Sequence, residues 1–158
     1  MKKTNAARIL EKAKIPYKIH EYQVDEDDLS AENVALKAGW PLEKVFKTLV
    51  AKGDKTGVIV ACLPGGGELN LKSLASLSGN KKVELVPLKE VLPLTGYIRG
   101  GVSPIGLKKN YPVYIHGSAF NFETILISAG ARGYQIEINP RDLQKVTGAT
   151  IGQLTISK

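Results

Sequence analysis

Residues 45–63, VFKTLVAKGDKTGVIVACL, predict the central hairpin of the fold. Two runs of apolar and β-branched residues, 45–51 and 57–63, are separated by a turn-rich segment, 52–56, and this arrangement predicts two antiparallel strands. A single cation, Lys47, lies within the first run. Its amine either reaches water at the edge of the sheet or points into a lined pocket, and the sequence leaves both alternatives open.

Short helices and further strands are predicted on both sides of this hairpin. Helices are expected at 4–14, from Asp28 or Ser30 to Gly39, at 71–78, 87–92 and 141–147, where Asn, Ser and Asp side chains can cap the starts and glycines the ends. Strands are expected at 17–22, 83–86, 113–116, 124–128, 134–138 and 150–156, and 129–133 is the turn of a second hairpin. The predicted fold class is α/β of the α+β type, a mixed and largely antiparallel sheet or partly closed barrel with short surrounding helices.

Length and composition predict one domain, 1–158. The chain has 43% hydrophobic and 23% charged residues, as ordinary soluble proteins do. The longest apolar runs are strand-sized and the N-terminus leads into an amphipathic helix, so no membrane span or export signal is expected. The single cysteine, Cys62, excludes an internal disulfide and fits a cytoplasmic location.

The chain is basic, with a formal net charge of +7 from 22 Lys and Arg against 15 Asp and Glu, and acidic residues cluster near the N-terminus. A surface that faces nucleic-acid phosphates would explain the excess, and scattered solvated lysines are the alternative. The basic residues considered for such a surface are Lys81, Lys82, Lys89, Arg99, Lys108, Lys109, Arg132, Arg141 and Lys145.

The second informative segment is 95–106, TGYIRGGVSPIG, in which four glycines and a proline surround Ser103. Such a loop either brings backbone N–H groups close to a ligand, as an anion or oxyanion site, or forms a tight irregular turn. It lacks the spacing of a dinucleotide-binding fingerprint and the Gly-Lys-Ser/Thr ending of a P-loop, and the glycines at 65–67 lack both as well.

Conventional catalytic residues are sparse. His20 and His116 lie far apart without metal-ligand spacing, so neither a metal nor another cofactor is expected. Cys62 lies inside an apolar strand and is expected in the core. His116 and Ser118 are too close in sequence for triad geometry, and no nucleophile elbow is present. No protein nucleophile is therefore visible.

The chain resembles the YbaK/EbsC family of aminoacyl-tRNA deacylases, relatives of the editing domain inserted in bacterial prolyl-tRNA synthetases, over nearly its whole length. The segments that carry the resemblance are VFKTL at 45–49, LNLK at 69–72, Gly96-Tyr97 with GGVSPIG at 100–106, and ISAGARG at 127–133. The lysine of the family's Phe-Lys-Thr-Leu strand falls on Lys47, and its Gly-x-x-x-Pro loop falls on 100–104. Neither element departs from the family pattern.

The resemblance implies hydrolysis of the ester between a mischarged amino acid and the tRNA 3′ end, with Cys-tRNA(Pro) as the usual substrate and the cysteine thiol as the nucleophile. It implies that Lys47 holds the terminal phosphate or other polar substrate groups, and that the N–H groups of Gly100 and Gly101 stabilise the oxyanion. Asp142 is a candidate for the α-ammonium group, with a favourable helix-dipole interaction as its alternative role. The residues implied in substrate binding are Tyr22, Phe46, Thr48, Ser103, Pro104, Ser128 and Asp142.

The implied partner is the aminoacylated acceptor end of tRNA, together with prolyl-tRNA synthetase, and no membrane is implied. Two other functions stay open. One is a related deacylase that removes alanine or another small amino acid and uses water as the nucleophile. The other is a non-catalytic module that binds tRNA or associates with a synthetase, although the intact Lys47 and Gly-x-x-x-Pro loop argue against it.

Overall fold

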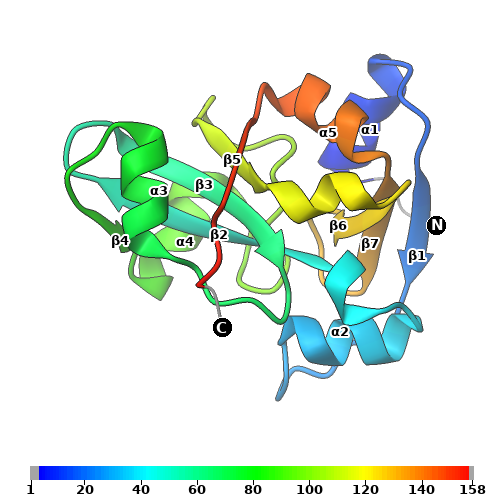
Figure 1. Ribbon diagram of the computed structural model, residues 1–158. Helices are drawn as coiled ribbons and strands as arrows, with labels where there is room; N and C mark the ends of the chain where they lie inside the picture. The colour runs from blue at the N-terminus through cyan, green and yellow to red at the C-terminus, as the bar shows by residue number, and fades with distance from the viewer. Residues whose placement is uncertain (1–3, 157–158) are drawn as a thin grey trace.

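The computed structural model describes residues 4–156, which form two β-sheets with short helices around them (Figure 1). One sheet has the strand order β1-β7-β6 and the other β4-β2-β3-β5-β8. The strands are β1 (Lys18–Glu21), β2 (Phe46–Gly53), β3 (Gly57–Pro64), β4 (Val83–Leu85), β5 (Val113–His116), β6 (Ile125–Ser128), β7 (Tyr134–Ile138) and β8 (Thr150–Gly152). The helices are α1 (Asn5–Lys12), α2 (Ala31–Ala38), α3 (Leu71–Ser78), α4 (Val91–Thr95) and α5 (Pro140–Thr147), with 3-10 helices η1 (Leu42–Lys44), η2 (Leu88–Glu90) and η3 (Gly117–Asn121).

Both predicted hairpins are confirmed. β2 pairs with β3 from Phe46 opposite Pro64 to Gly53 opposite Gly57, and β6 pairs antiparallel with β7. β3 is apolar throughout because both of its faces are covered. Ile59 and Leu63 face a cluster that includes α3, whereas Val60 packs into the core that the two sheets share.

The predicted helix ends are confirmed where a cap marks them. The Ser30 hydroxyl accepts a hydrogen bond from the Asn33 N–H, and the Asn70 side chain does the same for Ser73 at the start of α3. Gly39 ends α2 in the left-handed conformation that favours glycine. Local chemistry thus determines where these helices begin and end.

The predicted α+β class, with mixed and largely antiparallel strands and short surrounding helices, is confirmed, but the strands divide between two sheets. Within residues 4–156 the strands form two open sheets rather than a closed barrel, joined by a parallel bridge between Val45 and Leu126. The pairings of β3 with β5 and of β5 with β8 are parallel, which the long connections before β5 and β8 permit. The last strand is shorter than 150–156, and Thr155 forms only an isolated bridge with Leu69.

The turn between β2 and β3 depends on Asn80, whose buried side chain makes four hydrogen bonds. Its carbonyl oxygen accepts from the N–H groups of Lys55 and Thr56, and its amide donates to the hydroxyls of Thr56 and Ser78. We expect Asn80→Ala to lower the free energy of unfolding by about 2 kcal/mol, because partly buried backbone donors lose their acceptor. Urea denaturation measures this. Asn110→Ala, at an exposed position, is the matched control, and equal stability of the two variants would contradict the prediction.

Candidate functional site

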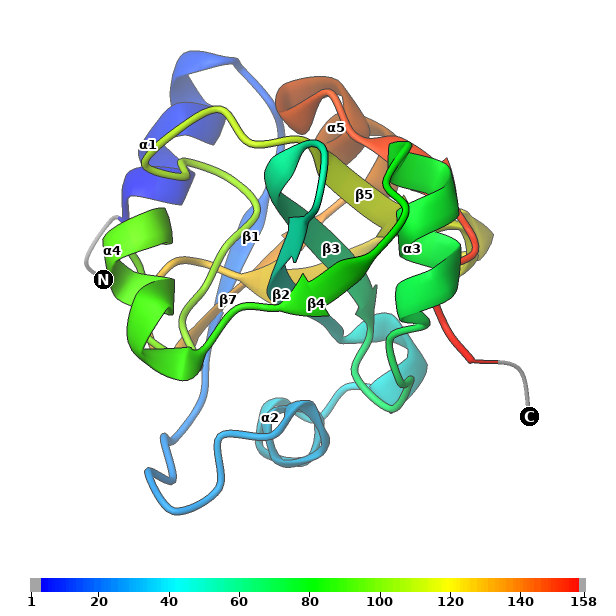
Figure 2. The same cartoon turned by 90° about the vertical axis from the view of Figure 1, so that its left-hand side faces the viewer.

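A cavity of about 400 Å³ lies beside β2, between α2 and the segment from β4 to α4. Its lining comes from the start of α2, residues 45–50, Gly65, the β4–α4 segment, the turn around Gly100, and the side chains of Ser128 and Gln135. Figure 2 shows the elements that bound it, with α2 below the strands and α4 to their left. Segments far apart in the sequence therefore build one site.

The cavity exists because β2 lacks a neighbouring strand along half of one edge. β4 pairs only with residues 51–53, and the Val86 N–H donates to the Val50 carbonyl at 3.1 Å just beyond that pairing. Adjacent residues of a strand direct their N–H and C=O groups to opposite edges. Thr48, two residues before Val50, therefore directs its backbone groups to the same open edge, where the cavity lies.

Lys47 points into this cavity, which decides between the two alternatives for its side chain. Its partly buried Nζ donates a hydrogen bond to the Gly65 carbonyl at 3.1 Å. Gly65 is closely surrounded, since a Cβ there would lie 2.3 Å from the Ala31 Cβ. This glycine lets α2 approach β2 and fixes the ammonium group at the same time.

The glycine loop forms a turn, and part of it also borders the cavity. The Gly101 N–H donates to the Ile98 carbonyl at 2.9 Å, and Gly100 has φ of +80°, the geometry of a type II turn with glycine in third position. Gly101 lies against Ala131 and does not line the cavity. The prediction that its N–H is a free oxyanion donor is therefore wrong.

Gly100 is the better placed of the two predicted donors. The carbonyl of the preceding peptide accepts a hydrogen bond from the Arg132 Nε at 2.8 Å. Because the N–H and C=O of a trans peptide point in opposite directions, the Gly100 N–H points away from Arg132. It forms no hydrogen bond within residues 4–156, and Gly100 lines the cavity.

Tyr97, which is part of the glycine loop, holds the loop together through its hydrogen bonds. Its hydroxyl donates to the Ile105 carbonyl at 2.5 Å, and its N–H donates to the Thr95 hydroxyl at 3.0 Å. The ring packs against Gly130, where a Cβ would lie 2.8 Å from the ring carbon Cε1. Position 130, in the loop after β6, therefore has to be glycine, because any side chain there would collide with the Tyr97 ring.

Two of the predicted substrate-binding residues, both in the glycine loop, lie outside the lining of the cavity. Ser103 is completely buried, and its hydroxyl accepts a hydrogen bond from the Ile105 N–H at 3.2 Å. Pro104 borders a separate cavity of about 270 Å³ between α1 and α5. Neither lines the cavity that contains Lys47.

Tyr22 and Asp142 also lie away from the cavity lining. The Tyr22 N–H donates to the Gly133 carbonyl at 2.9 Å, and its ring packs with Val34 behind α2. Asp142 lies in the first turn of α5, at the opposite end of the molecule from α2 (Figure 1). The position of Asp142 fits its alternative role at the helix N-terminus and not contact with the substrate.

Phe46, Thr48 and Ser128 do line the cavity, as expected of substrate-binding residues. Phe46 is only 3% exposed and forms part of its wall. The Thr48 hydroxyl lies 3.7 Å from the Cys62 sulfur. The Ser128 hydroxyl accepts a hydrogen bond from the Gly130 N–H at 3.1 Å, which ties this side of the site to the glycine that Tyr97 contacts.

Sequence reasoning missed Gln135 and Glu32, which both line the cavity. Gln135 is 4% exposed, and its side chain makes no hydrogen bond with any residue from 4 to 156, so its amide is available to a ligand. A polar residue between apolar neighbours in the strand 134–138 was the available signal. Glu32 gave none, since an acidic residue in the first turn of a helix is commonplace.

The remaining nucleophile and base candidates have buried functional groups. Cys62 is completely buried, and burial raises its pKa to about 12, so the thiolate is not formed at neutral pH. Burial lowers the pKa of His116, whose Nδ1 accepts a hydrogen bond from the Leu154 N–H at 3.0 Å. The Ser118 hydroxyl is buried without a partner in the described part of the chain. These observations confirm that Cys62 is a core residue.

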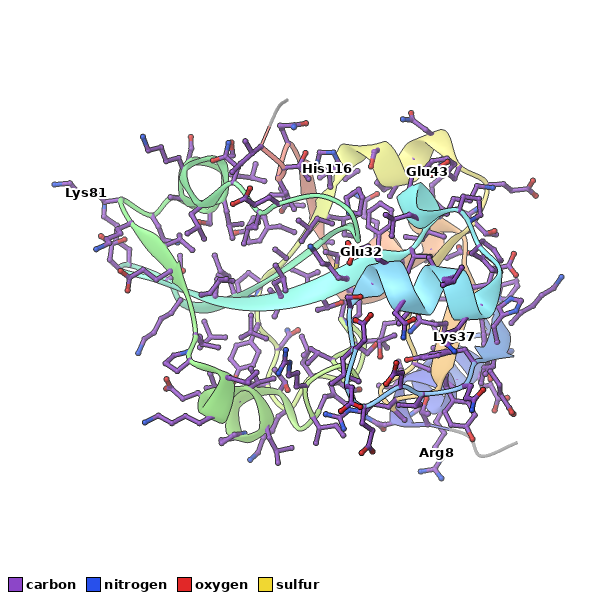
Figure 3. The ribbon with its side chains drawn as sticks, turned by 90° about the horizontal axis from the view of Figure 1, so that it is seen from below. Arg8, Glu32, Lys37, Glu43, Lys81 and His116 are labelled. Atoms are coloured by element: carbon purple, nitrogen blue, oxygen red, sulfur yellow. The ribbon has the colours of Figure 1, made fainter. Side chains whose placement is uncertain are left out.

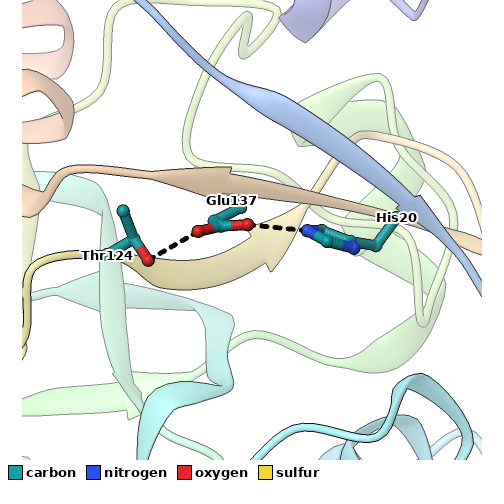
Figure 4. A network of polar contacts seen from close by, with 3 residues as sticks. All are labelled: His20, Thr124 and Glu137. Atoms are coloured by element: carbon teal, nitrogen blue, oxygen red, sulfur yellow. Dashed lines mark hydrogen bonds and ion pairs between the residues drawn. The ribbon is translucent and has the colours of Figure 1, made fainter.

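His20 belongs to a network on the three-stranded sheet (Figure 4). Its Nε2 lies 2.8 Å from a Glu137 carboxylate oxygen, and the Thr124 hydroxyl donates to the other oxygen at 2.8 Å. Burial raises the pKa of Glu137, but the hydrogen bonds from His20 and Thr124 outweigh it, so that the pKa lies below its usual value. Among residues 4–156 no three His, Cys, Asp or Glu side chains gather in a group that could hold a metal.

The basic residues considered for a phosphate-facing surface do not all lie at the cavity. Arg99 borders the cavity, and Arg132 is bound to its carbonyl. Lys81 lies far from α2 (Figure 3), and the neighbouring Lys82 pairs with Glu84 at 3.1 Å. Only part of the basic set can therefore contact a ligand in the cavity. Every helix from Thr4 to Ile156 falls short of the length and apolar character that a membrane span requires.

Comparisons with known proteins agree with this arrangement. The family model of the aminoacyl-tRNA editing domain matches residues 25–146. EbsC of Enterococcus faecalis, assigned as a Cys-tRNA(Pro)/Cys-tRNA(Cys) deacylase, is 50% identical over 153 residues, 97% of this chain and 93% of EbsC. A proline–tRNA ligase of Sulfurihydrogenibium sp. is 35% identical over 108 residues, which are 68% of this chain and 19% of the ligase.

A solved structure gives the same result for the fold. A protein assigned as a trans-editing enzyme for prolyl-tRNA synthetase superimposes with a TM-score of 0.82 at 24% identity, over 98% of this chain and 99% of that chain. The two proteins share their fold. With the sequence similarities, this confirms the predicted relationship: the chain belongs to the aminoacyl-tRNA editing domain family.

Proposed function

We propose that this protein is a trans-editing deacylase that cleaves the aminoacyl ester of Cys-tRNA(Pro). One observation carries the proposal: the cavity offers an ammonium group and main-chain donors, but neither a histidine nor a cysteine of residues 4–156 lies among its lining residues. The hydroxyls of Ser30 and Ser128 line it but accept backbone hydrogen bonds, and Cys62 is buried as a thiol. We therefore assign the attacking group to the substrate, with water as the alternative. The 50% identity to EbsC supports the same activity.

The substrate's own cysteine supplies the attacking group in the simplest mechanism. Its sulfur bonds to the ester carbonyl carbon, the bond from that carbon to the ribose oxygen breaks, and the thiol proton passes to the departing ribose hydroxyl. The product is a cyclic thiolactone, which water opens. Holding thiol and carbonyl in reacting geometry gives a large intramolecular advantage, so the protein needs only to position and polarise the ester.

The residues of the cavity fit this division of tasks. The Gly100 N–H stabilises the developing oxyanion, together with the backbone of Thr48, which also lines the cavity. The Lys47 ammonium binds the phosphate of the terminal adenosine. Phe46 and Ser128 bound the amino-acid side of the cavity, and the buried amide of Gln135 offers a hydrogen bond to the substrate.

The tRNA is recognised mainly through its acceptor end, since a chain of 158 residues offers little surface for reading more of it. Prolyl-tRNA synthetase is the proposed partner that delivers the correct tRNA, because relatives of this chain form part of such ligases. The protein would act as one domain in the cytoplasm, where translation takes place.

Release of amino acid from Cys-, Ala-, Ser- and Pro-tRNA(Pro) tests the proposal, together with Cys-tRNA(Pro) whose thiol is blocked by methylation. We expect rapid loss of cysteine alone and no cleavage of the blocked substrate. Preferential loss of alanine, or cleavage despite the blocked thiol, would show that water is the nucleophile and that the substrate thiol is not. Cleavage of none of them would instead favour a module that only binds tRNA.

A further inference from the structure

Glu32 is the one carboxylate among the residues that line the cavity. The other charged lining residues are the cations Lys47 and Arg99. Within residues 4–156, Glu32 forms no ion pair and no hydrogen bond through its side chain. An unpaired anion and a fixed cation therefore border the same space, and a ligand that bears both charges fits it.

The position of Glu32 is fixed by the packing of α2. Ser30 caps the helix, and the buried residues Val34 and Ala35 pack against Val45, which directly precedes β2. Figure 3 shows Glu32 at the end of α2 that lies beside β2, whereas Lys37 lies farther along the helix. The carboxylate is thus attached to a rigid element rather than to a mobile loop.

Gly65 places Glu32 and Lys47 at the same end of the cavity. Its carbonyl holds the Lys47 ammonium at 3.1 Å, and on its other side it contacts Ala31, the residue before Glu32. In space, Gly65 therefore lies between the start of α2 and Lys47 and contacts both. The two opposite charges thus border the one cavity, where a single aminoacyl-adenosine group can contact both.

An aminoacyl-tRNA end carries two kinds of charge, the anionic phosphates and the cationic α-ammonium group of the amino acid. The cations of the cavity suit the phosphates, and the ammonium needs an anion. Asp142, expected in this role, lies on α5 away from the cavity. We infer that Glu32 recognises the α-ammonium group of the substrate and thereby restricts the site to esters of amino acids with a free amino group. This inference rests on the proposed function.

Glu32→Gln tests this inference with two substrates, Cys-tRNA(Pro) and its N-acetylated form, which lacks the positive charge. We expect the wild type to prefer the free amine and Glu32→Gln to cleave it about tenfold to a hundredfold less efficiently, mainly through KM, because a hydrogen bond between charged groups is lost. Cleavage of the N-acetylated substrate should not change. Glu43→Gln, an exposed acid outside the cavity lining, is the matched control and should behave as the wild type.

The outcomes separate this inference from the proposed function. An equal decrease for both substrates, or none for either, would overturn the role of Glu32 and leave the deacylase activity of the wild type intact. A wild type that cleaves neither substrate would refute the proposed function and this assignment with it. Because glutamine keeps the size of the side chain at an exposed position, thermal unfolding should show that the variant folds.

Discussion

Replacing Lys47 by alanine or methionine is expected to lower the rate of cysteine release from Cys-tRNA(Pro) by about a hundredfold to a thousandfold. The Lys47 ammonium is held in the cavity by the Gly65 carbonyl, where its charge is partly shielded from water. A charge placed in advance contributes most where solvent is excluded, because no solvent then has to reorganise during the reaction. Single-turnover assays with enzyme in excess measure the effect on the chemical step.

Lys52→Ala provides the matched control for this prediction, since Lys52 lies on the same strand but is exposed outside the cavity. It should retain the activity of the wild type. Lys47→Met keeps most of the apolar stem, so its thermal stability should stay close to that of the wild type and loss of activity cannot be attributed to unfolding. Full activity of Lys47→Met would refute the role assigned to the ammonium group.

The elements of the fold are predictable from the sequence because their signals are local. The apolar and β-branched runs at 45–51 and 57–63 and the turn residues between them specify the β2–β3 hairpin. The capping residues Ser30 and Asn70 specify where two helices begin. The division into two sheets is not local. It depends on pairings such as that of β1 with β7, between residues more than a hundred positions apart, which no short pattern encodes.

The site is predictable only in part, for the same reason. Lys47 stands out because a cation interrupts an apolar strand, and the glycine loop because of its composition. Which N–H group of the glycine loop is free depends on a turn in which the Gly101 N–H donates to the Ile98 carbonyl. Glu32 reaches the cavity only because α2 packs over β2, and Asp142 does not because α5 packs elsewhere. A side chain such as Glu32, which reaches the site only through tertiary packing of its helix, gives no signal in the sequence.

The contact between Gly130 and Tyr97 links the loop after β6 to the glycine loop, and Gly130→Ala should disrupt both. Gly130 has φ of +96°, and the added Cβ would lie 2.8 Å from the Tyr97 ring. The ring cannot simply move aside, because its hydroxyl is bound to the Ile105 carbonyl. We expect a loss of about 2–5 kcal/mol in the free energy of unfolding, from backbone strain and overpacking together.

Gly148→Ala separates these two causes. Gly148 also has a positive φ, +69°, but no atom lies within 4 Å of the Cβ that would be added, so only backbone strain of about 1–2 kcal/mol is expected there. The difference between the two variants in urea denaturation then measures the contact with Tyr97. Because Tyr97 anchors the segment that contains Gly100, Gly130→Ala should also reduce deacylation by about tenfold or more, as small displacements of reacting groups do. Gly148→Ala should not, and equal activity and stability of the two variants would show that Tyr97 does not position the loop.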